Sequence, residues 1–515
     1  MANGATVGTL LPGQGHFRSR VRLAGAALVF GMETEGFAAS GRTLGTQFVS
    51  LEVTPVATPN SGIIAIPIRL WLAVGVVFLV ALLTQTSSGL SIGTALLPPA
   101  SLLLMVLPAG LWRSRWLFEC ALLLTTATII SGFVSRRAQG GVSARGWLQA
   151  ALLTALTIHG VLPPSPLVIQ SDVQLHGNKL SEVSKGNLFP TSRTDHQPPF
   201  EIPYGFSFYS LLSPWASSGT SNVAVVREGA AFFSALSVLA LALVLGRGSA
   251  IVAAASVVLW TFAPVNLRTM AFGNLSNIFA QAIFVLFLSG AVLMRPGLVR
   301  AGLLAFLAAL SATAHLSSFI VLLTLLLMTL PIAQSRSSAA FKPLLAGALL
   351  ASCYFATFLP LILAQAPRLL GERGGSAGVF DPWRLPNQVI LGAGWPLLAL
   401  VSLSVVVGRA RTVLPLARSL ALSALALAVA ALVSPVEVRY MLAVLPLLAI
   451  VGASAFDESS FARFPRQNLT SIVDLPWLRT LGSEAVMLPL AWLLLLVAVV
   501  NGAWILLQFL PLASV

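Results

Sequence analysis

The chain is short of charge and of cysteine. Only 9% of its 515 residues are charged, and just 16 are aspartate or glutamate. Its two cysteines, Cys120 and Cys353, both fall in apolar runs, which argues against a disulfide framework or a thiolate metal site. The sequence has no P-loop, no GxSxG, no HExxH and no Cys–His zinc spacing. These absences argue against the soluble enzyme classes that such motifs mark.

The chain is rich instead in long apolar runs. Hydrophobic residues make up 57% of it, and the mean hydropathy is +0.90. The runs are about 20 residues long, the length that a helix needs to cross a bilayer. They are continuous in Leu, Ala and Val rather than alternating, which favours helices over a membrane barrel. The sequence therefore predicts an all-α, polytopic transmembrane helical bundle of about 12–14 spans.

The predicted organisation has two parts. Residues 1–65 are rich in Gly, Thr and Ser and are expected to be poorly ordered, whereas 66–515 form the transmembrane domain with an external polar loop at 169–223. The two runs beside His315 also read as one run broken in the middle. The candidate spans lie near 68–86, 93–112, 117–135, 146–168, 224–246, 249–266, 274–295, 300–314, 316–334, 343–364, 388–408, 413–433, 438–456 and 486–511.

The net charge of +14 would suggest a nucleic-acid partner in a soluble protein. Here arginines that flank helices and face anionic membrane lipids explain it better, so no nucleic acid is expected.

Alternating the loops places the larger basic set on one side, the cytoplasmic side by the positive-inside rule. That set is Arg136, Arg137, Arg145, Arg247, Arg295, Arg300, Arg336, Lys342, Arg409, Arg411, Arg418, Arg463, Arg466 and Arg479. The 169–228 loop, His315, the 365–387 loop and Arg439 then share the external face, while Arg113 and Arg115 go against the pattern.

Ionisable residues are concentrated in the polar segment 171–209. Asp172, His176 and Lys179 stand at i, i+4 and i+7, so a helix there would bring all three to one face. Gly186 and the 187–190 stretch are expected to end that helix. The next part holds Pro198, Pro199 and Pro203, which forbid regular helix, and then Tyr204-Gly205-Phe206, which predicts an element at the membrane surface. The alternative is a solvated loop whose charges face water.

Three further features attract attention. Asn274 and Asn277 follow Arg268 and either cap the next helix or meet a substrate. His315 stands between two apolar runs, where an ionisable residue is a functional candidate, or else a core histidine with satisfied hydrogen bonds. Arg439, before another apolar run, is either an interfacial anchor or a site residue.

In this order the motifs resemble those of membrane glycosyltransferases of the GT-C superfamily, particularly bacterial members with no assigned substrate. The matching motifs are Asp172-Val-Gln-Leu-His176, Gly186-Asn-Leu-Phe-Pro190, Pro203-Tyr-Gly-Phe206, Asn274-Leu-Ser-Asn277, Ala314-His315-Leu, and Arg439-Tyr440 with Pro446. They cover about residues 145–456. The chain departs from the best-known members in lacking a paired Asp-Glu after the first span, a WWDYG-like signature and a large soluble C-terminal domain.

The resemblance implies transfer of a sugar from a polyprenyl-phosphate-linked donor to an acceptor at the external face of the membrane, here the bacterial inner (plasma) membrane. Asp172 would accept the proton of the acceptor hydroxyl, with His176 as the second catalytic candidate. Cationic or donor groups would stabilise the departing lipid phosphate. The substrate-binding candidates are Lys179, Tyr204, Arg268, Asn277, His315 and Arg439. Whether Asp172 and His176 also hold a divalent metal ion stays open, because no spacing rule fixes a second carboxylate (Asp195 or Glu201).

Two other classes stay open. A transporter or flippase would show internal repeats and polar groups in mid-span, whereas no clear repeat is present and the polar groups cluster near one interface. A structural subunit of a polysaccharide-export assembly would tolerate the loss of Asp172.

Overall fold

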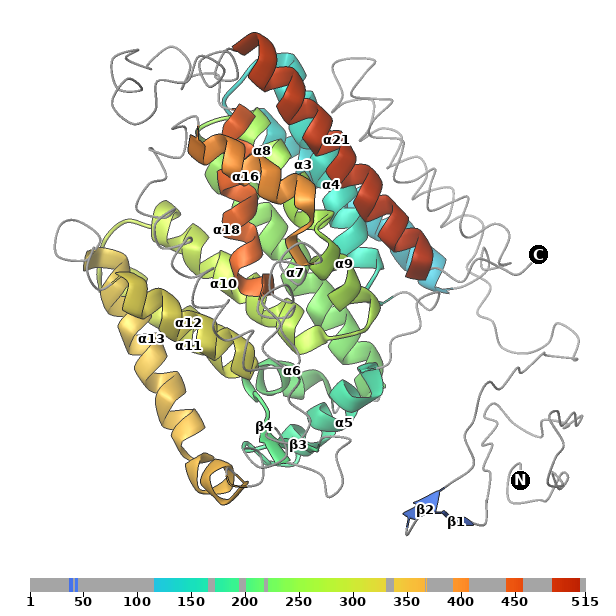
Figure 1. Ribbon diagram of the computed structural model, residues 1–515, viewed down its shortest axis with the longest axis vertical. Helices are drawn as coiled ribbons and strands as arrows, with labels where there is room; N and C mark the ends of the chain where they lie inside the picture. Colours follow the sequence, from blue (N-terminus) through green and yellow to red (C-terminus); the bar gives the residue numbers. More distant parts are fainter. Residues whose placement is uncertain are drawn as a thin grey trace, which may run out of the picture.

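The computed structural model describes residues 37–39, 42–44, 115–164, 172–193, 201–216, 221–329, 338–365, 367, 392–406, 441–456 and 484–509. In these residues the chain is helical apart from two short antiparallel pairs (Figure 1). One pair joins β1 (Phe37–Ala39) to β2 (Arg42–Leu44), and the other joins β3 (Thr191–Arg193) to β4 (Glu201–Pro203). The prediction of an all-α fold is confirmed. Apart from β1 and β2, the expectation for residues 1–65 lies outside the described residues.

Apart from α5 and α6, which lie in the predicted polar loop 169–223, the described helices overlap the predicted apolar runs. In chain order they are α3 (Arg115–Arg137), α4 (Val142–Val161), α5 (Val173–Ser184), α6 (Ser207–Ala216), α7 (Asn222–Gly246), α8 (Ala250–Thr261), α9 (Pro264–Ala271), α10 (Leu275–Leu293), α11 (Leu298–Ala314), α12 (Leu316–Thr329), α13 (Ser338–Ala356), α16 (Trp395–Val406), α18 (Met441–Ala453) and α21 (Glu484–Phe509), with a short 3-10 turn η4 (Ser454–Phe456). Every predicted run in the described residues overlaps a helix. The runs at 68–86, 93–112 and 413–433 lie outside the described residues.

Several of these helices suit a bilayer. By length and composition, α7, α10 and residues Leu488–Leu506 of α21 are long and apolar enough to cross a membrane. The number rises to five among the described residues if each of two bent helix pairs is one span. These helices fit a membrane protein, and the figure of 12–14 spans stays a prediction.

Two runs that the sequence presents as single spans are bent. The run at 249–266 is split into α8 and α9, which meet at 50°, and Pro264 opens the second helix. Proline lacks a backbone N–H and is tolerated at the first position of a helix, which explains the break. The run at 343–364 also bends by 56° between Phe341–Ala356 and Leu359–Gln365. Each run thus contains a bend that the apolar pattern alone did not predict.

The break at His315 is confirmed. His315 ends α11 in an extended conformation, with φ −157° and ψ 141°, and α12 begins at the next residue. The chain thus turns sharply within a long apolar stretch, and this turn carries polar side chains to the end of both helices.

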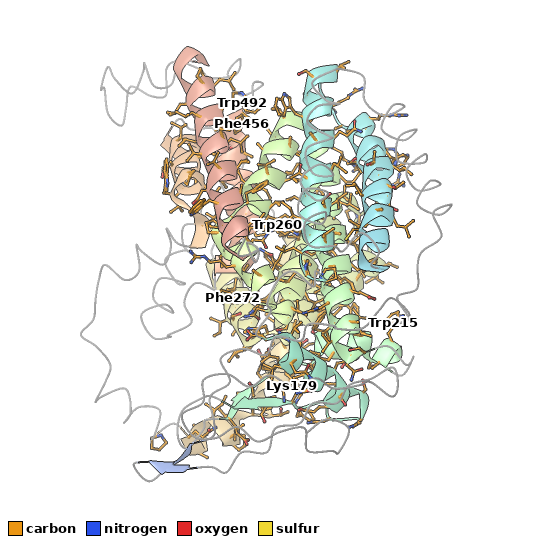
Figure 2. The ribbon with its side chains drawn as sticks, turned by 90° about the vertical axis from the view of Figure 1, so that its right-hand side faces the viewer. Lys179, Trp215, Trp260, Phe272, Phe456 and Trp492 are labelled. Carbon is orange, nitrogen blue, oxygen red and sulfur yellow. The ribbon has the colours of Figure 1, made fainter. Side chains whose placement is uncertain are left out.

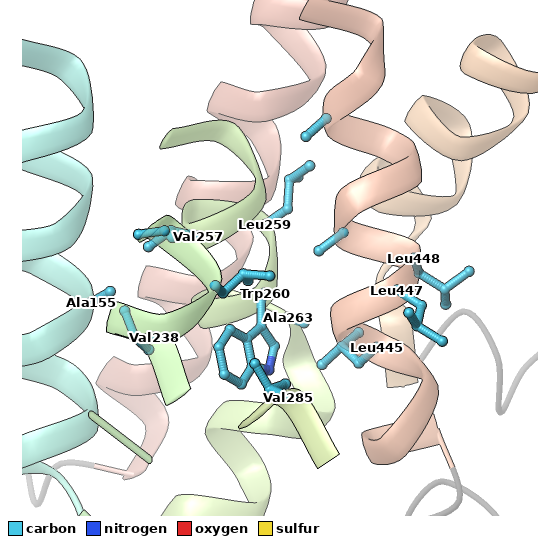
Figure 3. Packing of buried hydrophobic residues seen from close by; sticks show 14 of the residues in the cluster. Ala155, Val238, Val257, Leu259, Trp260, Ala263, Val285, Leu445, Leu447 and Leu448 are labelled. Carbon is cyan, nitrogen blue, oxygen red and sulfur yellow. The ribbon is translucent and has the colours of Figure 1, made fainter. Parts of the chain in front are cut away.

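The main core packs around Trp260 of α8, which is 1% exposed (Figure 3). Its neighbours come from distant parts of the chain, including Val238 of α7, Val285 of α10 and Leu445 of α18. A second cluster of buried residues joins α5, α6 and the start of α10. Figure 1 shows that α5, α6, β3 and β4 gather at one end of the long helices. The polar segment therefore covers one end of the bundle.

Candidate functional site

Helix α5 confirms the helix predicted in the polar segment. Its buried positions Val173, His176, Gly177, Leu180 and Val183 recur at helical spacing and form one face. That face packs against α6 and α7. The helix ends as predicted, because Gly186 adopts φ +96°, a left-handed conformation that favours glycine.

Asp172 stands at the junction of two helix ends. It is the N-cap residue of α5, yet its carboxylate makes no capping hydrogen bond to that helix. Its backbone N–H donates to the carbonyl of Phe272, 3.2 Å away, at the end of α9. Asp172 is half-buried, and this hydrogen bond attaches its backbone to the turn between α9 and α10.

His176 is fully buried, and both of its ring nitrogens are bonded. Nε2 accepts from the backbone N–H of Leu275 at 3.2 Å, and Nδ1 lies 2.6 Å from the hydroxyl of Tyr209. Since Nε2 accepts, the neutral ring carries its proton on Nδ1 and donates to Tyr209. Neither nitrogen is left for a metal ion or a proton transfer in this conformation. His176 thus positions Tyr209 and the start of α10 in this conformation, and its expected catalytic and metal-ligand roles stay predictions.

Lys179 is also held inside the protein. Its ammonium group donates to both carboxylate oxygens of Glu182, at 2.8 and 2.9 Å, and the residue is 7% exposed. The ion pair satisfies a charge that would be costly to bury alone. The expected contact of Lys179 with a donor substrate therefore requires this pair to open.

Tyr204 lies at the centre of the cluster of rings. Its ring centroid is 5.9 Å from that of His315, 6.3 Å from that of His176 and 6.2 Å from that of Tyr209. Its backbone carbonyl accepts from the Tyr354 hydroxyl of α13 at 2.8 Å. The predicted aromatic segment is thus packed between α11 and α13, close to both histidines of this end.

Gly205 and Phe206 explain the position of Tyr204. The N–H of Phe206 donates to the carbonyl of Thr313 at 3.0 Å, at the end of α11. A Cβ atom on Gly205 would collide with the backbone of Thr313 and Ala314. Only glycine allows so close an approach, so the Pro203–Phe206 motif acts as a docking element.

A hydrogen-bond chain joins α10 to the break at His315. The amide of Asn277 donates to Asn274 at 2.8 Å, and the oxygen of Asn277 accepts from the Ser317 hydroxyl at 3.0 Å. The N–H of Ser317 in turn donates to Nδ1 of His315 at 3.2 Å. This contact favours the His315 tautomer with its proton on Nε2. The side chain of Asn277 therefore connects the first turn of α10, including its N-cap residue Asn274, to Ser317 and His315.

The two arginine candidates differ. Arg268 is half-buried in the last turn of α9, and its carbonyl accepts from the N–H of Phe272, the residue that also holds Asp172. Arg268 therefore lies one helical turn before Phe272, the residue whose carbonyl binds the backbone of Asp172. Arg439 lies outside the described residues.

The described residues also bear on metal binding. Among them, no three His, Cys, Asp or Glu side chains gather closely enough to hold a metal ion. Of the two carboxylates considered as a second ligand, Asp195 lies outside the described residues, and Glu201 is bonded through its backbone to Gln365.

Sequence reasoning missed Tyr209, Ser317 and Tyr354, which connect the predicted residues. Tyr209 is fully buried in an apolar stretch and reads as core, and Tyr354 lies inside an apolar run. The sequence did offer one indication of the two tyrosines, because tyrosine is rare in this chain, with only 4 residues.

Comparison of the chain with models of protein families, with curated proteins and with solved structures found no match.

Proposed function

We propose that the protein is a membrane glycosyltransferase that moves a sugar from a polyprenyl-phosphate-linked donor to an acceptor hydroxyl at the external face of the membrane. The proposal is supported by one observation above the others. Tyr204, Asn277 and His315 are joined by ring contacts and hydrogen bonds near the start of α10, and the backbone of Asp172 is bonded to Phe272 just before that helix. In a chain with so few polar residues, such a gathering is expected at a site rather than by accident.

The proposed chemistry needs one base and a phosphate cradle. The oxygen of the acceptor hydroxyl attacks the anomeric carbon, and its proton passes to the Asp172 carboxylate. The bond from that carbon to the phosphate oxygen breaks, and its electron pair leaves with polyprenyl phosphate. Arg268, Arg439 and the Nε2–H of His315 are the groups proposed to stabilise the charge on that phosphate. Arginine suits this role because its planar group binds phosphate through two hydrogen bonds.

The remaining candidates have supporting roles in this proposal. Tyr204 places its ring in an edge-to-face contact with that of His315, and Asn277 keeps His315 in place through Ser317. His176 holds Tyr209 and the start of α10, and Lys179 keeps α5 together through Glu182.

The test is replacement of Asp172 by asparagine, which removes the base and keeps the shape. The protein is reconstituted in liposomes with a panel of synthetic polyprenyl-phosphate-linked hexoses and pentoses as donors and with glycans that carry free hydroxyl groups as acceptors. Release of free polyprenyl phosphate is then measured. For a donor that the wild type turns over, Asp172→Asn should slow release by roughly 10²–10⁴-fold, the range for loss of a general base. Asn178→Ala, an exposed change on the same helix, is the matched control and should retain the wild-type rate. Equal release by Asp172→Asn and the wild type would overturn the role of Asp172.

A transporter or flippase is the second candidate, and the broken helices favour it. Interrupted spans at α8–α9 and at His315 are features that transporters use to build binding sites. The same assay separates the two, because a flippase would move the lipid-linked sugar between leaflets without releasing polyprenyl phosphate.

A further inference from the structure

The end of the molecule opposite the candidate site carries a group of arginines that the proposed reaction does not use. Helix α4 starts at this end and runs toward the end that holds α5 (Figure 1). The group consists of Arg136 and Arg137 at the end of α3, Arg145 at the start of α4, and Arg247 after α7, here called the arginine cluster. All four are exposed.

The backbone holds the two turns of the arginine cluster together. Gln139, in the α3–α4 turn, donates to the carbonyl of Gly246 and accepts from the N–H of Ala250, both at 2.7 Å. Arg136 and Arg137 lie within three residues of Gln139, and Arg247 follows Gly246 directly. These positions, more than 100 residues apart in sequence, are thus fixed side by side by two short hydrogen bonds.

Two of the side chains are oriented as well. The Nε of Arg145 donates to the carbonyl of Ala138 at 3.1 Å, which keeps Arg145 beside the same turn. The guanidinium carbon of Arg137 lies 3.9 Å from the ring centroid of Phe133. This stacking limits the motion of the charged group at the surface of the apolar helix.

Acidic residues are absent from the chain around both turns. The sequence contains no aspartate or glutamate from residue 120 to residue 171, or from residue 229 to residue 371. The ion pair of Lys179 with Glu182 belongs to α5, at the other end of the molecule. The arginine cluster therefore has no acidic residue close to it in sequence.

Tryptophan marks the depth of this end in a bilayer. Trp147, two residues after Arg145, packs against Trp492 of α21 with ring centroids 5.6 Å apart. Figure 2 shows Trp492 near one end of the molecule and Lys179 near the other. Tryptophan concentrates at the level of the lipid headgroups, and that is where a lipid phosphate lies.

We propose that the arginine cluster is a binding site for the phosphate of an anionic phospholipid. The preformed pair of turns presents several guanidinium groups at headgroup depth, and guanidinium binds phosphate oxygens through paired hydrogen bonds. The site would tie α3–α4 to α7–α8 through a lipid, on the face opposite the proposed transfer reaction. It does not depend on that reaction.

The test compares retained lipids by native mass spectrometry of the purified full-length protein, with phosphatidylglycerol and phosphatidylcholine as probes. The wild type should retain phosphatidylglycerol in preference to phosphatidylcholine. The double variant Arg137→Gln/Arg247→Gln should weaken phosphatidylglycerol binding by about thirtyfold. This factor corresponds to two attractions of ~1 kcal/mol each at ~1.4 kcal/mol per tenfold. Arg145 is left unchanged because its side chain donates a hydrogen bond to Ala138 and so helps to hold the α3–α4 turn.

The matched control is Arg295→Gln/Lys342→Gln, which removes two exposed positive charges elsewhere on the molecule. It should keep phosphatidylglycerol binding within about threefold of the wild type, since the bridged turns are intact. Equal losses in the two double variants, or equal retention of the two lipids by the wild type, would overturn the proposal. Displacement of phosphatidylglycerol by millimolar inorganic phosphate would overturn the assignment to a lipid and point to free phosphate. A thermal scan of each variant confirms that it is folded.

Discussion

Tyrosine is rare in this chain, and three of its four tyrosines meet at the candidate site. Tyr204 contacts Tyr209 through its ring, and its carbonyl accepts from the hydroxyl of Tyr354. Tyr209 also accepts from His176. A tyrosine hydroxyl in an apolar environment needs a hydrogen-bond partner, so each of these residues fixes another segment of the chain.

The pair of His176 and Tyr209 leads to a prediction of stability. Tyr209→Phe keeps the ring but removes the hydroxyl, which leaves the Nδ1–H of His176 buried without its partner. We expect a loss of ~1–3 kcal/mol in the free energy of unfolding, the cost of an unsatisfied buried donor. The midpoint of thermal unfolding in detergent measures it, with Phe208→Leu on the same helix as a comparison for simple loss of volume. An unchanged midpoint would show that the contact is not stabilising.

The same variant gives a test at high pH. Burial raises the pKa of Tyr209 well above its usual value of 10.0. Above pH 10 the unfolded chain releases this proton while the folded protein keeps it, so the stabilisation present below pH 10 is lost as the pH rises toward the folded value. Unfolding midpoints of the wild type should therefore fall more steeply above pH 10 than those of Tyr209→Phe. Parallel curves would contradict this assignment.

Helix α11 and the Pro203–Phe206 motif depend on each other. The end of α11 supplies the carbonyls of Thr313 and Leu310, which accept from Phe206 and from the hydroxyl of Ser207. The motif in turn covers the break at His315. Packing of this kind gives a loop the precision that substrate groups need.

Gly205→Ala tests that packing. The added methyl group would collide with the backbone of Thr313 and Ala314, which cannot move as a flexible side chain would. We expect destabilisation of ~1–3 kcal/mol, typical of overpacking, and a shifted Tyr204. The control is Gly302→Ala on α11, where a Cβ meets nothing within 4 Å. Alanine in a helix is favoured over glycine by up to ~1 kcal/mol, so this control should not lower the thermal midpoint. Equal thermal midpoints for the two variants would show that the close packing of Gly205 on α11 does not stabilise the protein.

The helices were predictable from sequence because long apolar runs leave little choice of structure. The break at His315 could also be predicted from the sequence, since polar residues interrupt the apolar run there. The break between α8 and α9 was not, because Phe262 and Ala263 are apolar and Pro264 alone marks it. The β3–β4 pair was missed for a different reason: each strand has three residues, too few for a pattern.

The candidate residues could be selected from the sequence, but their geometry could not. The contact of Asp172 with Phe272 and the chain from Asn277 to His315 join segments far apart in sequence, so no local spacing contains them. The inward direction of His176 could not be read either, because the helical face shared with Asp172 and Lys179 could equally face water. The partners Tyr209 and Leu275 decide that direction.

The whole molecule has two unlike ends. Asp172, Tyr204 and His315 gather at one end of the helices, and the arginine cluster lies at the other. The positive-inside rule predicts that the arginine-rich end is cytoplasmic, which would place the candidate site outside. A lipid-linked sugar reaching the site from the outer leaflet would then meet the acceptor without crossing the membrane.

Labelling of single cysteines tests this orientation. The background is Cys120→Ala/Cys353→Ala, which removes both native thiols. Gln174→Cys then places an exposed thiol on α5 beside the site, and Gly248→Cys places one next to Arg247. In intact cells whose outer barrier is permeabilised, a membrane-impermeant maleimide should label the thiol at 174, whereas the thiol at 248 should react only after lysis. A full span separates the two positions, because α7 is long enough to cross the bilayer and ends at Gly246. Labelling of both from the same side would place the arginine cluster and Asp172 on one face, and both the external site and the cytoplasmic lipid contact would then fail.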